Sequence, residues 1–376
     1  MKKKINTLIE NGADINKEKR NYEIPLFLYY MQMNYGNKDL EKYFVYKEAL
    51  LFKTYENRNK DLVECLVKNG AEINKENKDE LVEYLVVEHG ADINKEDEDG
   101  TTPLFKACEG GNKDLIKCLV EHGAEINKEN EDGTTPLFKA IKSGKKDLEE
   151  CLVEHGADIN KENWNGETPL FNACKSGNKD LVECLVEHGA DINKENWNGE
   201  TPLFNACKSG NKDLVECLVE HGAKINKKDE VGVTPLFKAV ESRNKDLVKY
   251  LIKHGANINK KNKDDGETPL FKAIESGNKD LVECLVELGA DINKEWIGET
   301  PLFRAIKSGN KNLVEYLVLE HRANINKENE DGETPLFKAC KSGNKDLVEY
   351  LVVEHRADIN KKNKYGKTST YGERIP

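Results

Sequence analysis

The sequence predicts an all-α repeat solenoid in which short helix-turn-helix units with extended finger loops stack side by side. Three observations support this fold class. The tetrapeptide Thr-Pro-Leu-Phe occurs eight times, and its successive prolines are 33, 33, 33, 33, 34, 32 and 34 residues apart. The segment Asp158–Ala190 is repeated without change as Asp191–Ala223. At 376 residues the chain is also too long for one compact core, whereas a solenoid needs only contacts between neighbours.

The first helix of each unit is predicted to begin at the proline of this tetrapeptide. In the copy from Trp164 to Asn196, Thr168 is expected to be the helix N-cap. Pro169 takes the first helical position, where its missing N–H costs nothing. Gly177 is expected to end this helix. Its apolar side consists of Leu170, Phe171, Ala173 and Cys174.

A second helix is predicted directly after the first. Asn178 is expected to cap it, and Asp180 lies in the first turn, where the helix dipole favours a carboxylate. Gly189 follows the helix and can adopt the left-handed conformation that ends many helices. Glu183 and Glu187 are expected to point outward. The buried stripe is predicted to consist of Leu181, Val182, Cys184, Leu185 and Val186.

An extended finger is predicted between one unit and the next, with its tip at Asn198-Gly199, a dipeptide typical of hairpin turns. A finger, a helix, a tight turn and a helix at a period of 33 resemble the ankyrin repeat, whose signature is Thr-Pro-Leu-His-x-Ala. The matching stretch at 168–173 reads Thr-Pro-Leu-Phe-Asn-Ala. The resemblance implies an ankyrin-like stack. All eight copies carry Phe where the family usually has His, so contacts between repeats are expected to be more apolar there.

The resemblance divides the chain into three parts. Residues 99–363 contain eight clear repeats, residues 1–98 contain degenerate and partly truncated ones, and residues 364–376 form a C-terminal tail. In the last two repeats Arg322 and Arg356 replace the helix-ending glycine. A β-carbon in a left-handed conformation costs roughly 1 kcal/mol. The second helices of these repeats are therefore predicted to end differently or to fray first.

Composition argues against several classes of partner and setting. The net charge of -11 does not suit a phosphate backbone, so no nucleic acid is expected. No apolar run approaches the ~18 residues of a membrane helix, so no membrane is expected. The ten cysteines lie in helical positions without a C-x-x-C pair, and are interpreted as small buried residues rather than disulfides or zinc ligands. An intracellular, cytoplasmic setting follows.

No catalytic, cofactor-binding or metal site is predicted, and the chain is not expected to be an enzyme. The histidines recur at one register near the end of the second helices. Those in adjacent repeats would be about 10 Å apart in packed helical layers, too far to share a zinc ion. They are interpreted as hydrogen-bond donors or cations near a helix C-terminus. The register contains His89, His122, His155, His188, His221, His254, His321 and His355.

Three tryptophans, Trp164, Trp197 and Trp296, stand beside the predicted finger turns. Tryptophan is enriched among the residues that contribute most to protein interfaces. These side chains are therefore candidate partner contacts. The alternative is that each ring packs on a neighbouring finger.

The first helices carry two rows of basic residues. The inner row follows each Phe and contains Lys106, Lys139, Lys238, Lys272, Arg304 and Lys338. The outer row lies three positions further on, and so on the same face. It contains Lys142, Lys175, Lys208, Lys307 and Lys341. Only three acidic residues, Glu109, Glu241 and Glu275, share these registers, while the outward side of the second helices is acidic. The alternative is a solvated face without a ligand.

These features predict a protein–protein interaction scaffold. In ankyrin-like stacks the fingers and first helices form the concave face, which is expected to bind a protein, or an acidic segment of one, in a salt-sensitive way. Two alternatives remain at this point: a targeting or adaptor fragment of a larger protein such as a ligase adaptor, and a spacer with no dedicated partner. The sequence does not define the oligomeric state.

Overall fold

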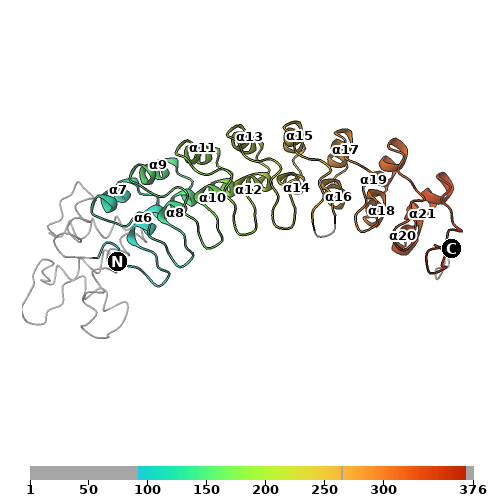
Figure 1. The fold of residues 1–376 in the computed structure, drawn as a ribbon, viewed down its shortest axis with the longest axis horizontal. Coiled ribbons are helices and arrows are strands. Elements are labelled where there is room, and N and C mark those ends of the chain that lie inside the picture. Colours follow the sequence, from blue (N-terminus) through green and yellow to red (C-terminus); the bar gives the residue numbers. More distant parts are fainter. Residues whose placement is uncertain (1–91, 264–265, 370–376) are drawn as a thin grey trace, which may run out of the picture. The chain divides into compact units, whose positions relative to one another are not determined.

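The computed structural model describes residues 92–263 and 266–369 (Figure 1). Within these ranges the chain forms sixteen α-helices in successive pairs, and no strand beyond two isolated β-bridges. The predicted all-α repeat solenoid is therefore confirmed. The predictions made for residues 1–91 lie outside the described residues.

The helices follow the tetrapeptide closely. The first helices are α6 (Pro103–Gly110), α8 (Pro136–Ser143), α10 (Pro169–Ser176), α12 (Pro202–Ser209), α14 (Pro235–Glu241), α16 (Pro269–Glu275), α18 (Pro301–Lys307) and α20 (Pro335–Ser342). The second helices are α7 (Lys113–Glu121), α9 (Lys146–Glu154), α11 (Lys179–Glu187), α13 (Lys212–Glu220), α15 (Lys245–Lys253), α17 (Lys279–Glu287), α19 (Lys311–Glu315) and α21 (Lys345–Glu349). Two π-helical turns, η3 (Tyr316–Glu320) and η4 (Tyr350–Glu354), follow α19 and α21.

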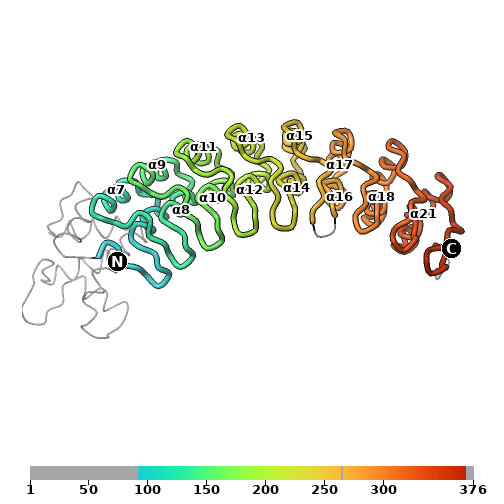
Figure 2. The backbone as a smooth tube through the Cα atoms, in the orientation of Figure 1, coloured from blue at the N-terminus to red at the C-terminus, as the bar shows by residue number. Residues whose placement is uncertain are grey.

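The described residues divide into two compact units, residues 92–172 with 187–190 and residues 173–186 with 191–263 and 266–369. In the first unit α6 packs on α8, and α7 packs on α9. In the second unit the first helices from α12 to α20 pack on one another in chain order, and α13, α15 and α17 form a second layer. Figure 2 shows that the fingers of the second unit extend from the side of the first helices.

The first helices begin where predicted, but without the predicted side-chain cap. Thr201, before α12, has extended backbone angles (φ −105°, ψ 167°), and its hydroxyl makes no cap hydrogen bond. This hydroxyl is buried and has no partner among the described residues. Instead, the Thr201 carbonyl accepts a hydrogen bond from Phe204 N–H at 2.9 Å, next to a proline whose φ is already helical. The same unpartnered hydroxyl occurs at Thr102, Thr135 and Thr168, which corrects the cap predicted for Thr168.

The second helices begin and end as predicted. Leu181 N–H donates to Asn178 Oδ1 at 3.3 Å, which caps α11. Gly189 adopts the left-handed conformation, with φ of 91°. The predicted stripe is buried at Leu181, Val182, Cys184 and Leu185. Val186 is only half-buried, so the sequence analysis overestimated the burial of this residue.

The finger tips differ from the predicted hairpin turn. In the finger before α12, Gly199 N–H donates to the Asn196 carbonyl at 2.9 Å, so Trp197 and Asn198 are the central turn residues. Gly199 adopts φ of 73° after the turn. The side chain of Asn196 is buried, and its Oδ1 accepts from the N–H groups of Asn198 and Glu200, both at 3.0 Å. The predicted turn centred on Asn198-Gly199 is wrong because the Asn196 side chain organises the loop one residue earlier.

The described repeats have an apolar core at the position where this sequence carries Phe in place of the family's usual His. The motif phenylalanines of all eight described first helices are buried, including Phe171 and Phe204. The cysteines of the described residues are buried as well and are free thiols. The expected apolar contact between repeats at the phenylalanine position therefore agrees with the burial.

The last two repeats depart from the others at the end of the second helix. Each contains one additional residue, which a π-helical turn accommodates. Arg322 and Arg356 follow with φ of 53° and 57°, in the left-handed region. The prediction that these helices end differently is confirmed. Whether they fray first stays a prediction.

Candidate protein-binding surface

Two of the three tryptophans are exposed on finger tips. Trp164 is 61% and Trp197 is 68% exposed. Trp164 N–H donates to the Asp132 carbonyl of the preceding finger at 3.2 Å. Its ring also lies so close to Gly133 that a Cβ atom there would collide with it. Trp164 therefore rests on its neighbouring finger at one edge and keeps most of its surface in solvent.

The structure places Trp296 differently. Its finger is one residue shorter, and Trp296 and Glu299 exchange two backbone hydrogen bonds at 2.8 and 2.9 Å. The ring meets Phe271 edge to face at 5.4 Å, and the Arg304 guanidinium lies 3.7 Å from its centroid. Both contacts are with the chain's own residues, so the half-buried Trp296 offers less surface to a partner than Trp164 and Trp197.

The inner basic row is largely paired within the chain, which sequence analysis missed. Lys338 Nζ lies 2.6 Å from Glu299 Oε1 at the base of the preceding finger, and Arg304 lies 3.2 Å from Glu275. Burial lowers the pKa of Lys272, but the carboxylates of Glu267 and Glu275 outweigh burial and raise this pKa above its ordinary value. Lys106 and Lys238 make similar pairs with Asp97 and Glu200. For Lys238, Lys272 and Lys338 the available signal was the glutamate directly before the threonine of a finger, namely Glu200, Glu267 and Glu299.

The outer row is the more accessible of the two. Its five lysines are all exposed, whereas every inner-row cation is half-buried. The outward side of the second helices, predicted to be acidic, is instead mixed in charge. Lys179 lies 3.0 Å from Glu183, and Lys279 lies 3.2 Å from Glu283, one helical turn apart. The difference in charge between the surface of the first helices and the outward side of the second helices is therefore smaller than the sequence predicted.

An asparagine at the base of several described fingers joins consecutive repeats. Asn193 Oδ1 accepts from Lys224 N–H at 2.8 Å, and Asn193 Nδ2 donates to the Gly222 carbonyl at 3.1 Å. We call this pair of bonds the asparagine clamp. The complete clamp is also formed by Asn94, Asn127, Asn226 and Asn259. Its signal in the sequence is the recurring Ile-Asn-Lys after each second helix. The clamp of Asn193 holds the base of the finger that carries Trp197 against the repeat that follows.

Comparison with known families agrees with this architecture. The family model described as ankyrin repeats matches residues 74–163, 160–229, 227–296 and 293–363. The chain belongs to the ankyrin-repeat family. Ankyrin repeats are generally protein–protein interaction modules and are typically non-catalytic. A search of the curated proteins gives no match.

Four histidines of these ankyrin repeats act as the predicted hydrogen-bond donors. His221 donates from Nδ1 to the Cys217 carbonyl one turn earlier, at 2.7 Å. His122, His155 and His254 make the same bond. Among the described residues, no cluster of three or more His, Cys, Asp or Glu has a geometry suited to a metal ion.

The cysteines of the ankyrin repeats lie in the core. Burial raises the pKa of the thiols of Cys108, Cys174 and Cys207, which disfavours the reactive thiolate. Their burial agrees with their interpretation as small apolar residues. No helix in the described ranges combines the length and the apolar character needed to cross a bilayer.

Proposed function

We propose that this ankyrin-repeat chain is a non-catalytic scaffold that binds a partner protein through its finger tips and first helices. The observation that carries the proposal is the exposure of Trp164 and Trp197 on fingers whose conformation is fixed from within. Asn163 and Asn196 hold the two turns through their buried or half-buried side chains. A large aromatic side chain on a rigid loop loses little entropy on binding, which favours an interface role.

The charge of the partner is a separate part of the proposal. Because five inner-row cations are already paired, an acidic partner segment would depend on the exposed outer-row lysines. Changing Lys208, Lys307 and Lys341 to Glu is then expected to weaken binding and to reduce its salt dependence. Unchanged binding after this reversal would remove the acidic segment while leaving the protein-binding role intact.

The proposed surface is tested by capture from native lysate followed by quantitative mass spectrometry. Partners that bind the surface should be lost with Trp164→Ala/Trp197→Ala. Leu319→Ala is the matched control, because Leu319 is also 61% exposed but lies at the end of a second helix. Partners retained equally by both variants would argue against this surface. Absence of any reproducible partner would favour the spacer interpretation.

A further inference from the structure

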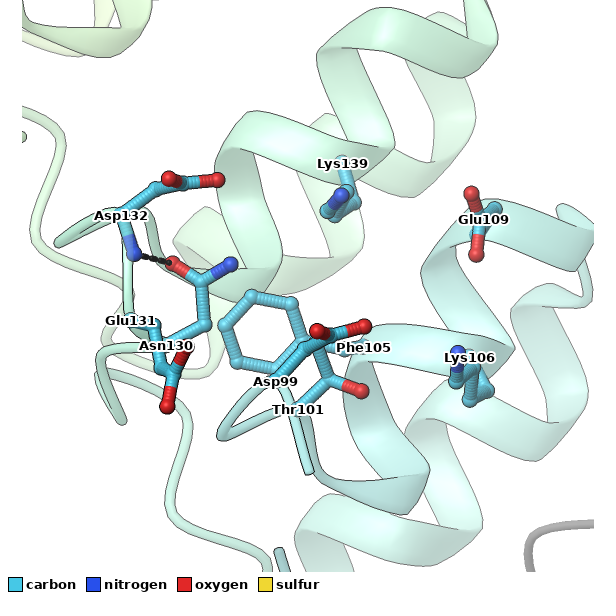
Figure 3. Close-up of a pocket in the computed structure, with 9 residues that line it drawn as sticks. All are labelled: Asp99, Thr101, Phe105, Lys106, Glu109, Asn130, Glu131, Asp132 and Lys139. Carbon is cyan, nitrogen blue, oxygen red and sulfur yellow. Dashed lines mark hydrogen bonds between the residues drawn. The ribbon is translucent and has the colours of Figure 1, made fainter. Parts of the chain in front are cut away.

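A hollow of about 330 Å³ lies between two successive fingers of the first unit (Figure 3). Asp99 at the tip of one finger and Glu131 and Asp132 at the tip of the next lie around it. Phe105 of α6 and Lys139 of α8 also line the hollow. The hollow is therefore surrounded mainly by polar groups, including carboxylates from two fingers, and Phe105 beneath it is almost completely buried.

The charge of this hollow is opposite to that expected for the basic rows. Asp99, Glu131 and Asp132 are exposed, and their carboxylates form no ion pair with any residue that the structure describes. Lys106, on the same wall, lies 3.5 Å from Asp97, which already balances its charge. Lys139 alone therefore opposes the carboxylates, and the hollow has an excess of negative charge.

A buried amide supplies an independent indication of a ligand. Asn130 is 7% exposed, and its Oδ1 accepts from Asp132 N–H at 3.1 Å and from Thr134 N–H at 2.9 Å. Its Nδ2 donates to none of the described residues. In Figure 3 this nitrogen lies on the side of the amide opposite the bond to Asp132, toward Phe105. This nitrogen remains accessible within an otherwise buried residue, so an acceptor of a ligand in the hollow could receive its hydrogen bond.

We propose that this hollow binds an arginine or lysine side chain of an extended partner segment. The cationic head would pair with Asp99, Glu131 and Asp132. A backbone carbonyl of the same segment would accept the hydrogen bond from Asn130 Nδ2. This inference rests on the proposed protein-binding function and assigns a basic partner segment to the first unit.

The last described repeats provide a matched control. The finger 329–332 carries the same acidic pair, Glu330 and Asp331, at the same tip positions. Its preceding finger, however, has Ile297-Gly298 at the tip and no carboxylate equivalent to Asp99. Substitutions in either finger change the net charge of the chain equally, so general attraction of a basic peptide to an acidic protein cancels in the comparison.

The test selects random 12-residue peptides displayed on phage against the full chain and measures the synthesised binders by fluorescence polarisation. We expect the selected peptides to contain arginine or lysine. Glu131→Gln/Asp132→Asn should weaken them about tenfold, and Glu330→Gln/Asp331→Asn should change affinity less than about twofold. Acidic or uncharged binders, or equal losses in the two variants, would overturn the inference.

The same peptides distinguish this inference from the proposed function. Binders weakened by Trp164→Ala or Trp197→Ala but not by Glu131→Gln/Asp132→Asn would overturn the basic site alone. Binders insensitive to every finger substitution would overturn both proposals. Far-ultraviolet circular dichroism of each variant checks that these exposed substitutions leave the helices intact.

Discussion

The regular repeats at 201–291 and the irregular repeats at 300–363 lie in the same unit but are joined differently. Asn226 and Asn259 form complete clamps to the repeat that follows. Asn293, at the equivalent place, bonds to neither the carbonyl nor the N–H of the next loop within the described residues. Asn326 keeps one bond, from Asp358 N–H at 3.2 Å. The junctions to the two repeats with one additional helical residue thus keep one clamp bond or none.

Cation–π contacts between neighbouring second helices occur in both regions. Lys212 lies 5.5 Å from the centre of the Tyr250 ring in regular repeats that keep the Asn226 clamp. Lys279 lies over the ring of Tyr316, and Lys311 over that of Tyr350, at 5.8 and 5.6 Å. Such exposed cation–π contacts are worth about 0.5–1 kcal/mol each, whereas a clamp contains two hydrogen bonds of about 1 kcal/mol each. The comparison teaches that similar ankyrin repeats can stack through different junctions, with the weaker ones near the last repeats.

Restoring the regular length should produce the largest effect. Deletion of Leu319 together with Arg322→Gly gives this helix end the same length and glycine as its regular counterparts. We expect the free energy of unfolding to rise by about 3 kcal/mol, from two new clamp bonds and the removal of left-handed strain at Arg322. Urea denaturation followed by circular dichroism measures this change. A decrease would mean that the π-helical turn stabilises the junction.

Removing the clamp should have unequal consequences in the two regions. Asn226→Ala is expected to lower the free energy of unfolding by about 1–2 kcal/mol, because two hydrogen bonds are lost. Asn293→Ala should change it by less than about 0.5 kcal/mol, as for an ordinary surface substitution. Both variants are compared by urea denaturation. Equal effects would contradict the assignment of the clamp as the distinguishing contact.

Local patterns predicted the helices because each decisive residue acts within its own repeat. Pro169 and Asn178 determine helix starts, and Gly189 determines a helix end, through bonds that span only a few residues. The clamp of Asn193 was overlooked because its partners lie about one repeat away, and the sequence does not show which polar groups meet across that distance. The pairing of Lys338 with Glu299 was overlooked for the same reason.

The candidate contacts illustrate the same limit. The sequence places Trp164, Trp197 and Trp296 in one class, because each stands near a finger turn. A single missing residue moves Trp296 from the tip to the position that asparagine holds in regular fingers, where it packs on Phe271. The location of the tryptophans near the finger turns was therefore predictable from the sequence. The exposure of each ring was not, because it depends on the length of the finger loop.

The left-handed arginines allow a more local test of the comparison. Arg356→Gly should raise the free energy of unfolding by roughly 1 kcal/mol, because glycine adopts the observed φ without strain. Hydrogen exchange before this substitution should be faster for the amides of 350–356 than for those of 217–222. After it, protection at 350–356 should increase up to about fivefold. Exchange as slow as in the regular repeat before substitution would contradict the predicted fraying.

The threonine hydroxyls should give the smallest difference between the regions. Thr201 Oγ1 is buried without a partner, so Thr201→Val should be neutral or stabilise by up to about 1 kcal/mol. The hydroxyl of Thr334, before α20, makes no cap hydrogen bond either, yet it does not share the complete burial of Thr201 Oγ1. Thr334→Val should therefore change stability by less. A loss of about 1 kcal/mol in Thr201→Val, the ordinary cost of removing an N-cap side chain, would show that the hydroxyl caps α12 in solution.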